Sequence, residues 1–396
     1  MSVEGQVSIV MSLAGQSVSD VSVLSQRPLL AQQLLAGSQA DAAPQTVAMV
    51  FRLCARAQAA ASVSAVEQAK GIVASSHAQT VRQQLVRMEV LREHLWRVLL
   101  DWPVLRGLKA ESLLMKQMLQ LDKEWHACMD VEGKAFVCGA EPAEISKDKA
   151  ISLLMQLGQL LKEHVFYMPP QSFYDCKRAE DYLLWAQYTQ PGVAPFIQWL
   201  VLQGWQQSGQ TEESILPRLS CDWLNERLNS DEAEQFMAMP ELHHKPCETT
   251  PYARQQSHSL MIELEKKFGN GLLPRFTAVL LELAAVYLEM THALLQPVSI
   301  QHDAATRIEH VGLGAVEAAR GRLIHRVSLA GDKVKTYQIV APTEWNFHPD
   351  GVLKQALLKL QGDVQAIEQQ GRLLIHAMDP CVQFSLQVNI PEQAHA

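Results

Sequence analysis

Apolar and polar residues alternate at the start of the chain. Every second position of the first run is apolar: Val7, Ile9, Met11 and Leu13. This alternation predicts a strand with one buried face. A glycine-containing turn at residues 14–17 and a returning run with Val21 and Val23 predict a β hairpin. A lone hairpin is marginally stable in water, so we expect it to pack on another part of the chain.

From about residue 45 to residue 300 the apolar spacing changes to every third or fourth position, which predicts helices. One helix around residues 81–99 should end near Pro103, because a proline disfavours helical geometry in the residue before it. Its polar positions, such as Arg82 and Glu93, are expected mainly on other faces than the apolar one. Further helices are predicted near residues 108–127, 143–163, 178–189, 194–207, 211–228, 252–267 and 272–295.

Strands return after residue 305. Residues 322–328 and 334–340 are rich in β-forming residues and flank a short connection with Gly331-Asp332, which predicts a second hairpin. A short helix is expected at 352–360 and a strand at the apolar run 373–375. Because β elements bracket a helical middle, we predict one α+β domain over residues 1–396. Its parts are a hairpin region (1–36), a helical region (45–300) and a mixed region (305–396).

Composition narrows the classes of function. The chain has 396 residues, a net charge of −8 and 48% apolar residues, enough for a large core. It lacks the basic stripe of a nucleic-acid-binding protein. The longest apolar stretch, 276–295, contains Glu282, Glu289 and His292, which favours a core helix over a membrane span. Without a recognisable signal peptide, we expect a cytoplasmic protein whose seven cysteines are thiols.

Four short motifs occur in a fixed order. Residues 52–57 read Arg-Leu-Cys-Ala-Arg-Ala, 317–321 read Glu-Ala-Ala-Arg-Gly, 341–346 read Ala-Pro-Thr-Glu-Trp-Asn and 379–384 read Asp-Pro-Cys-Val-Gln-Phe. Each motif alone is a weak signal. Together they resemble the large subunit of nickel–iron hydrogenases, as does the opening Val-Glu-Gly-Gln at residues 3–6. The resemblance covers roughly 130 residues at the two ends and implies the large-subunit fold.

The departures from this family concern its metal ligands. The family binds nickel through two pairs of cysteines, and the second cysteine of each pair is here Ala57 and Phe384. Neither side chain can donate to a metal, so the bridged nickel–iron centre cannot form as it does in the family. Gln387 stands where the family ends its C-terminal motif with a histidine, and Gln6 stands for the histidine of the opening motif.

Other positions of the family's site survive. Cys54 and Cys381 match the first cysteine of each pair and are the candidate metal ligands. Arg320, Pro342 and Thr343 match residues that lie against the cyanide and carbon monoxide ligands of the iron. Glu4 matches a proton-gate position, which has no evident use without hydrogen chemistry.

The chain therefore is similar to the large-subunit-like maturation scaffolds of the HupK/HoxV type. The resemblance implies a non-catalytic protein that transiently holds iron carrying cyanide and carbon monoxide, without nickel, and passes it to the hydrogenase large subunit. In the family the two missing cysteines contact the iron, so Cys54 and Cys381 would have to take over that role. The expected partners are that subunit, a small iron-fragment chaperone and a larger assembly factor, with no nucleic acid and no membrane insertion.

Other interpretations remain open. Cys54 and Cys381 could be inert buried thiols, since free cysteine is among the most buried residue types. The protein could then be a metal-free chaperone of hydrogenase subunits, or alternatively a divergent redox enzyme with another metal. Three further groups have ligand chemistry but lack partner ligands at suitable spacing, and are expected to be structural: Glu289 with His292, His243-His244 with Cys247, and Cys128 with Cys138.

Overall fold

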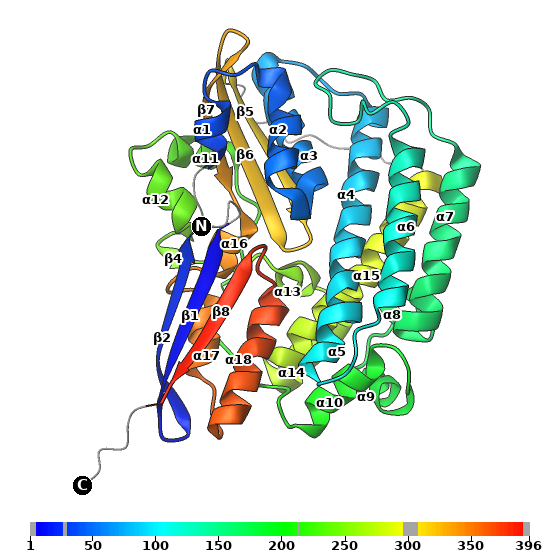
Figure 1. Ribbon diagram of the computed structural model, residues 1–396, viewed down its shortest axis with the longest axis vertical. Coiled ribbons are helices and arrows are strands. Elements are labelled where there is room, and N and C mark those ends of the chain that lie inside the picture. The colour runs from blue at the N-terminus through cyan, green and yellow to red at the C-terminus, as the bar shows by residue number, and fades with distance from the viewer. Residues whose placement is uncertain (1–4, 27–29, 213, 296–307, 391–396) are drawn as a thin grey trace.

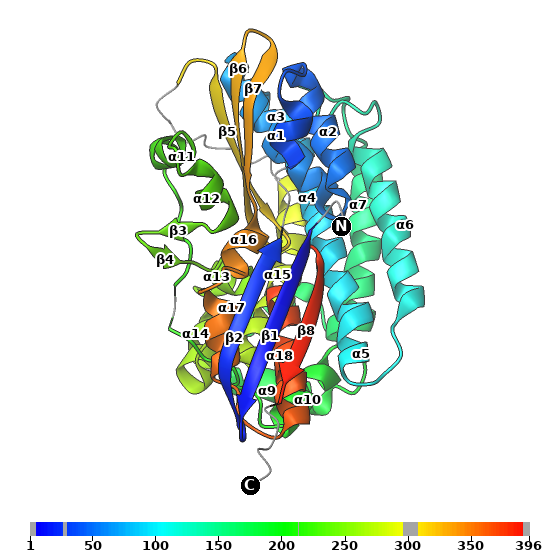
Figure 2. The same cartoon turned by 60° about the vertical axis from the view of Figure 1, so that its left-hand side comes forward.

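A three-stranded sheet joins the two ends of the chain. The computed structural model describes residues 5–26, 30–212, 214–295 and 308–390. Strand β1 (Gln6–Ala14) lies between β2 (Ser17–Gln26), its antiparallel hairpin partner, and β8 (Gln383–Asn389), with which it pairs in parallel (Figure 2). The predicted N-terminal hairpin is confirmed, and the opposite end of the chain supplies the strand beside it.

Helices form the middle of the chain, and most of them lie on one side of the two larger sheets (Figure 1). Before residue 130 they are α1 (Leu30–Leu35), α2 (Ala43–Val50), α3 (Ala55–Lys70), α4 (Ser76–Trp96), α5 (Trp102–Leu105) and α6 (Ser112–Met129). The later ones are α7 (Lys147–Leu160), α8 (Pro170–Tyr174), α9 (Ala179–Tyr188), α10 (Ala194–Leu202), α11 (Cys221–Leu228), α12 (Ala233–Ala238), α13 (Pro251–Gln255), α14 (Ser259–Phe268) and α15 (Leu272–Leu295). Four short turns accompany them: the 3₁₀ turns η1 (Ala40–Ala42) and η2 (Arg52–Cys54), and the π turns η3 (Arg97–Asp101) and η4 (Leu161–Phe166).

Helix α15 lies at the centre of the core. Its side chains are buried along most of its length, and Phe276 packs edge-on against Trp102 and Phe196. Over the described residues, α15 is the one helix long and apolar enough to cross a membrane. It packs as a core helix, as its interrupted hydrophobicity predicts.

The second large sheet consists of β5 (Val311–Ala318), β6 (Gly321–Ala330) and β7 (Lys333–Val340), all antiparallel. Helix α3 lies directly on it, because β5 presents glycine toward the helix. A Cβ on Gly314 would collide with the backbone carbonyl of Ala61. This close approach between helix and strand holds the start of α3 in a fixed position relative to the β5–β6 turn.

Short elements complete the fold: the strands β3 (Glu241–Leu242) and β4 (Lys245–Pro246), and the helices α16 (Pro342–Asn346), α17 (Val352–Leu358) and α18 (Val364–Met378). The predicted strand at residues 373–375 is wrong, since these residues belong to α18. The last strand, β8, is formed instead by the alternating run Phe384, Leu386 and Val388, for which no strand was predicted.

Several predicted helix boundaries also need correction. The helix of residues 81–99 does not end before Pro103, because η3 carries it into α5, where Pro103 lies in the first turn. The helix predicted near 211–228 begins only at Cys221, and the one near 194–207 ends at Leu202. Residues 252–267 form two helices rather than one.

Candidate functional site

Four of the residues singled out in the sequence line one small cavity of about 10 Å³: Cys54, Arg320, Pro342 and Cys381. The other lining residues are Gln58, Ala318, Ala319, Leu323 and Ala341. They come from the start of α3, the β5–β6 turn, the end of β7 with α16, and the segment before β8. The fold thus brings together the four motifs that are separated along the chain.

Cys54 occupies the N-cap position of α3. Two side chains of helix α4 hydrogen-bond to the backbone before and after Cys54. The Glu89 carboxylate accepts from the backbone N–H groups of Arg56 (2.8 Å) and Ala57 (3.0 Å), while Arg92 donates to the carbonyl of Leu53 (3.1 Å). The first N–H groups of a helix have no partner within the helix, so a carboxylate here fixes the turn that carries Cys54.

Cys381 follows α18 after a sharp turn. Asp379 ends that helix in the left-handed conformation (φ 51°), which residues other than glycine adopt rarely. Its carboxylate forms ion pairs with Arg97 (2.7 Å) and Arg320 (3.2 Å). Burial alone would raise the pKa of Asp379, but the arginines outweigh it and leave the pKa below its ordinary value. Asp379 is therefore an anion that fixes the approach of the chain to Cys381.

Arg320 is 2% exposed and stands between two carboxylates. Its guanidinium lies 3.1 Å from Glu93 and 3.2 Å from Asp379, yet Nε and one terminal nitrogen have no hydrogen bond of good geometry. Burial by itself lowers the pKa of the guanidinium. The groups around it outweigh this effect and leave the pKa well above its ordinary value: Asp379, Cys381, Glu93 and Cys54. The cavity wall therefore carries a permanent positive charge beside both sulfurs.

Helix α16 supplies the remaining wall. Pro342 lines the cavity, whereas Thr343 follows it and does not. Thr343 is 2% exposed, and its hydroxyl has no hydrogen-bond partner within the part of the chain that the structure describes. A buried hydroxyl without a partner costs free energy, and this one belongs to the residue directly after Pro342 of the cavity wall.

Apolar side chains fill the positions of the two replaced cysteines. Ala57 is fully buried, and Phe384 lies half-buried on β8 with its ring edge-on to His376 at 5.5 Å between centroids. Gln387 and Gln6 are exposed on β8 and β1. Glu4, the expected proton-gate position, lies outside the described residues.

Several residues that hold the site were not singled out from the sequence: Gln58, Glu89, Arg92, Glu93 and Asp379. Asp379 is the first residue of the motif at 379–384, so the sequence did carry a signal for it. Glu93 was expected on a polar face, but it is buried because Arg92 and Arg320 pair with it. Arg82 is likewise buried, against Glu67 at 2.7 Å. Helical periodicity cannot distinguish a solvated charge from a paired, buried one.

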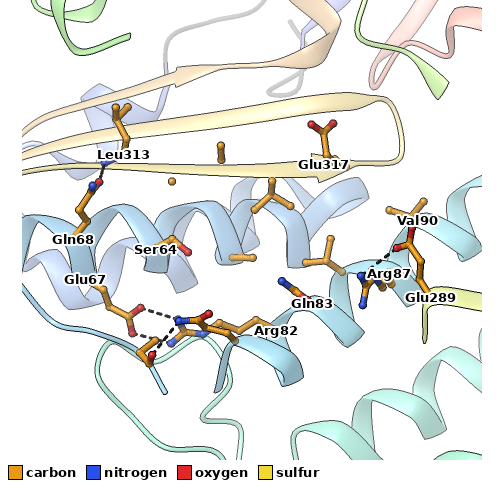
Figure 3. Close-up of a pocket in the computed structure, with 18 of the residues that line it drawn as sticks. Ser64, Glu67, Gln68, Arg82, Gln83, Arg87, Val90, Glu289, Leu313 and Glu317 are labelled. Atoms are coloured by element: carbon orange, nitrogen blue, oxygen red, sulfur yellow. Dashed lines mark hydrogen bonds and ion pairs between the residues drawn. The ribbon is translucent and has the colours of Figure 1, made fainter. Parts of the chain in front are cut away.

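A separate groove of about 800 Å³ lies between β5, α3, α4 and α15. Figure 3 shows Glu67 and Arg82 paired on one side of it, with Arg87 and Glu289 paired farther along (3.1 Å). The groove and the small cavity share one wall residue, Ala318. Its charged groups pair largely with one another.

The fold has clear counterparts among solved structures. The nickel–iron–selenium hydrogenase of Desulfovibrio vulgaris Hildenborough matches with a TM-score of 0.63 at 15% identity, over 93% of this chain and 94% of that chain. The enzyme of Desulfomicrobium baculatum matches with a TM-score of 0.64 at 16% identity, over 94% and 95%. Residues 273–386 match the family described as nickel-dependent hydrogenase. The fold is that of a hydrogenase large subunit.

By sequence, this large-subunit-like chain is similar to hydrogenase expression/formation proteins. It is 26% identical to HupK of Azotobacter vinelandii, over 97% of this chain and 98% of that protein. It is 28% identical to HoxV of Cupriavidus necator, over 92% of each. Against HupK of Rhizobium leguminosarum bv. viciae the identity is 46%, over 22% of this chain. The similarity to HupK and HoxV therefore spans nearly the full length, as expected for a large-subunit-like maturation protein.

Proposed function

We propose that this protein acts in hydrogenase maturation by holding an iron centre that carries cyanide and carbon monoxide, without nickel. It then passes this centre to the hydrogenase large subunit. Its relatives are named for hydrogenase expression and formation, which supports the general role. The finer proposal rests on one observation: Cys54 and Cys381, from opposite ends of the chain, line the same cavity as Arg320 and Pro342.

The chemistry of the cavity is consistent with such a cargo. Thiolates are soft donors that suit iron with strong-field ligands. Cyanide is anionic, and a guanidinium with incompletely used donors can hydrogen-bond its nitrogen. Within the described residues, no three His, Cys, Asp or Glu side chains are grouped to hold a metal. A cargo that brings its own diatomic ligands needs fewer protein donors, so two sulfurs are enough.

The proposal makes the protein a non-catalytic, cytoplasmic assembly factor. Its partners would be the proteins that make and carry the iron unit, namely a small chaperone and a larger assembly factor, and the large subunit that accepts it. A cavity of about 10 Å³ has room for about one water molecule. Loading the iron unit therefore requires the cavity walls to move apart.

The decisive experiment is infrared spectroscopy of protein purified without oxygen from a host that makes the iron unit. Cyanide and carbonyl stretching bands are expected in the native chain and in Cys128→Ser, which changes a buried cysteine that does not line the cavity. Cys54→Ser and Cys381→Ser should abolish the bands. Metal analysis should find iron but less than one nickel per chain. Bands that persist in the double serine variant would contradict the proposal, as would one tightly bound nickel with hydrogen uptake.

The small cavity favours a second candidate, a metal-free chaperone that mimics the large subunit. In that case the double serine variant would support hydrogenase maturation in cells as well as the native chain does. Loss of maturation in the double variant, with maturation unchanged in Cys128→Ser, would exclude the metal-free role. The same variants therefore separate the two candidates.

A further inference from the structure

A glutamine lies one helical turn beyond Cys54. Gln58 is 1% exposed, and its Nε2 atom is 3.5 Å from the sulfur of Cys54, to which it donates. Residues four apart share a face of a helix, so α3 carries both side chains toward the cavity. A buried amide must be satisfied at both its nitrogen and its oxygen.

The oxygen of Gln58 is satisfied by a buried histidine. His325 on β6 is fully buried, and its Nε2 atom lies 2.9 Å from Gln58 Oε1. On its other side His325 Nδ1 is 2.7 Å from the hydroxyl of Tyr337, which is 2.6 Å from the hydroxyl of Ser62. Ser62 belongs to α3, so the polar chain starts and ends on that helix.

The tautomer of His325 determines which end of the amide faces the sulfur. The amide nitrogen faces Cys54 and its oxygen faces Nε2 of His325, an orientation that requires a proton on Nε2. Turned by half a rotation, the amide would point its oxygen at the sulfur. A thiolate bound to a metal has no proton to offer that oxygen, so two acceptors would face each other.

We propose that Gln58 is a positioning residue for the metal-binding form of Cys54, and that His325 orients its amide. The inference rests on the proposed function in taking Cys54 as a ligand. The amide nitrogen donates to the bound sulfur and holds it toward the cavity. Hydrogen bonds to ligating sulfurs tune the properties of metal centres, and groups that orient ligands commonly change affinity 10–100-fold.

The test uses Cd²⁺ as a probe, since it binds thiolates without the iron assembly machinery. In the purified full-length chain, Gln58→Met removes the donor and keeps an unbranched side chain. We expect Cd²⁺ affinity to fall about 10–100-fold, and the sulfur-to-cadmium absorption band to move to longer wavelength. The matched control is Gln84→Met, because Gln84 is also fully buried but donates to Met290 and does not line the cavity. It should leave both readouts unchanged.

A separate variant tests whether His325 orients the amide of Gln58. His325→Phe leaves Gln58 in place but frees its amide to turn, so the loss of affinity should lie between those of the native chain and Gln58→Met. If Gln58→Met does not unfold cooperatively, Gln58→Ala replaces it, since alanine is the best helix former. A folded variant of Gln58 that binds Cd²⁺ as tightly as the native chain, with the same absorption band, overturns the inference.

This outcome is distinguishable from failure of the proposed function. A native chain that binds Cd²⁺ through Cys54 but never carries cyanide or carbonyl bands contradicts the proposed cargo and leaves the role of Gln58 standing. Conversely, infrared bands that disappear in the cysteine variants, together with a Gln58→Met variant that behaves like the native chain, refute only the role of Gln58. A native chain that does not bind Cd²⁺ overturns the role of Gln58, whereas the infrared bands still decide the proposed cargo.

Discussion

The side-chain amide of Asn346 donates a hydrogen bond to the backbone carbonyl of Arg320, with 2.9 Å between nitrogen and oxygen. Its oxygen accepts from the backbone N–H of Thr249, also at 2.9 Å. One fully buried side chain thus ties α16, which carries Pro342 and Thr343, to the turn that carries Arg320. Gly321 follows in a conformation that favours glycine (φ 134°), and a Cβ there would collide with Thr249.

Asn346→Ala should therefore weaken both the fold and the site. It leaves a buried carbonyl and a buried N–H without partners, which costs roughly 2–5 kcal/mol of unfolding free energy. Denaturant unfolding measures this loss. Asn270→Ala is the control, because Asn270 also accepts from a backbone N–H and donates to a side chain, both of Thr211, but makes no hydrogen bond to a residue that lines the cavity. Both variants should be less stable, and only Asn346→Ala should lose the infrared bands of the cargo.

Arg320→Leu should weaken retention of the iron unit. The change removes the donors beside the cavity and leaves the buried carboxylates of Glu93 and Asp379 without this partner, at a cost of about 3–5 kcal/mol. Arg320→Lys keeps the charge but lacks the planar fork, so it should recover part of the stability and less of the retention. Equal cyanide band intensity in all three proteins, measured at temperatures where each is folded, would contradict a role in holding the cargo.

Thr343→Val tests whether the hydroxyl of Thr343 serves the fold or binds the cargo. The hydroxyl has no partner in the described chain, so replacing it with a methyl group should leave the unfolding free energy unchanged or raise it by about 1 kcal/mol. If the hydroxyl hydrogen-bonds a cyanide of the cargo, a cyanide stretching band should shift in the same variant. A large loss of stability with unshifted bands would show instead that Thr343 serves the fold.

The raised pKa of Glu89 predicts that the free energy of unfolding depends on pH near neutrality. Burial raises its pKa to about 7, although Arg92 and the N–H groups of Arg56 and Ala57 act in the opposite direction. The folded chain therefore holds a proton that the unfolded chain releases near its ordinary pKa of 4.5. The contribution of Glu89 to stability is then fully present below about pH 4.5 and is lost as pH rises through about 7.

The expected size of this loss is on the order of 3 kcal/mol, from the pKa difference. Glu89→Gln removes the titrating group, so unfolding free energies measured between pH 5 and pH 8 should fall less steeply than in the native chain. Glu124→Gln, at a half-buried position on α6 where the carboxylate accepts from Gln120, serves as the control. A native slope that Glu89→Gln leaves unchanged would show that Glu89 does not titrate in this window.

Deleting residues 1–28 should cause aggregation rather than yield a stable remainder. The deletion removes β1 and β2, so β8 loses its partner strand and the sheet's buried face loses Val7, Ile9 and Met11. An exposed apolar surface of this kind promotes association. Light scattering and cooperative unfolding are the readouts, with deletion of residues 391–396 as the control. A soluble fragment from about residue 45 that unfolds cooperatively would contradict the single-domain organisation.

Local pattern was sufficient for the elements whose periodicity is strong. The N-terminal hairpin, the hairpin of β6 and β7, and α15 are confirmed, because alternation and helical spacing reflect one buried face each. Local pattern was insufficient where apolar residues are few or continuous. Residues 373–375 are helical, and residues 203–212 and 214–220 are largely irregular. A short apolar run fits either a strand or a buried helix, and neighbours decide between them.

The sequence by itself determined which chemical groups are available: two cysteines in short motifs, an arginine, a proline and a threonine, and the absence of the two other cysteines. Only the tertiary structure decided which of them meet. Parallel pairing of β1 with β8 brings the C-terminal segment beside the start of the chain, and glycine on β5 lets α3 carry Cys54 against the β5–β6 turn. The burial of Glu93 and Asp379 against Arg320, and the contact from Gln58 to Cys54, also depend on this packing. The ion pairs of Arg320 join residues far apart in the chain, and the residue pattern within one segment carries no information about them. Gln58 lies only four residues from Cys54, but its amide is oriented by His325 on β6.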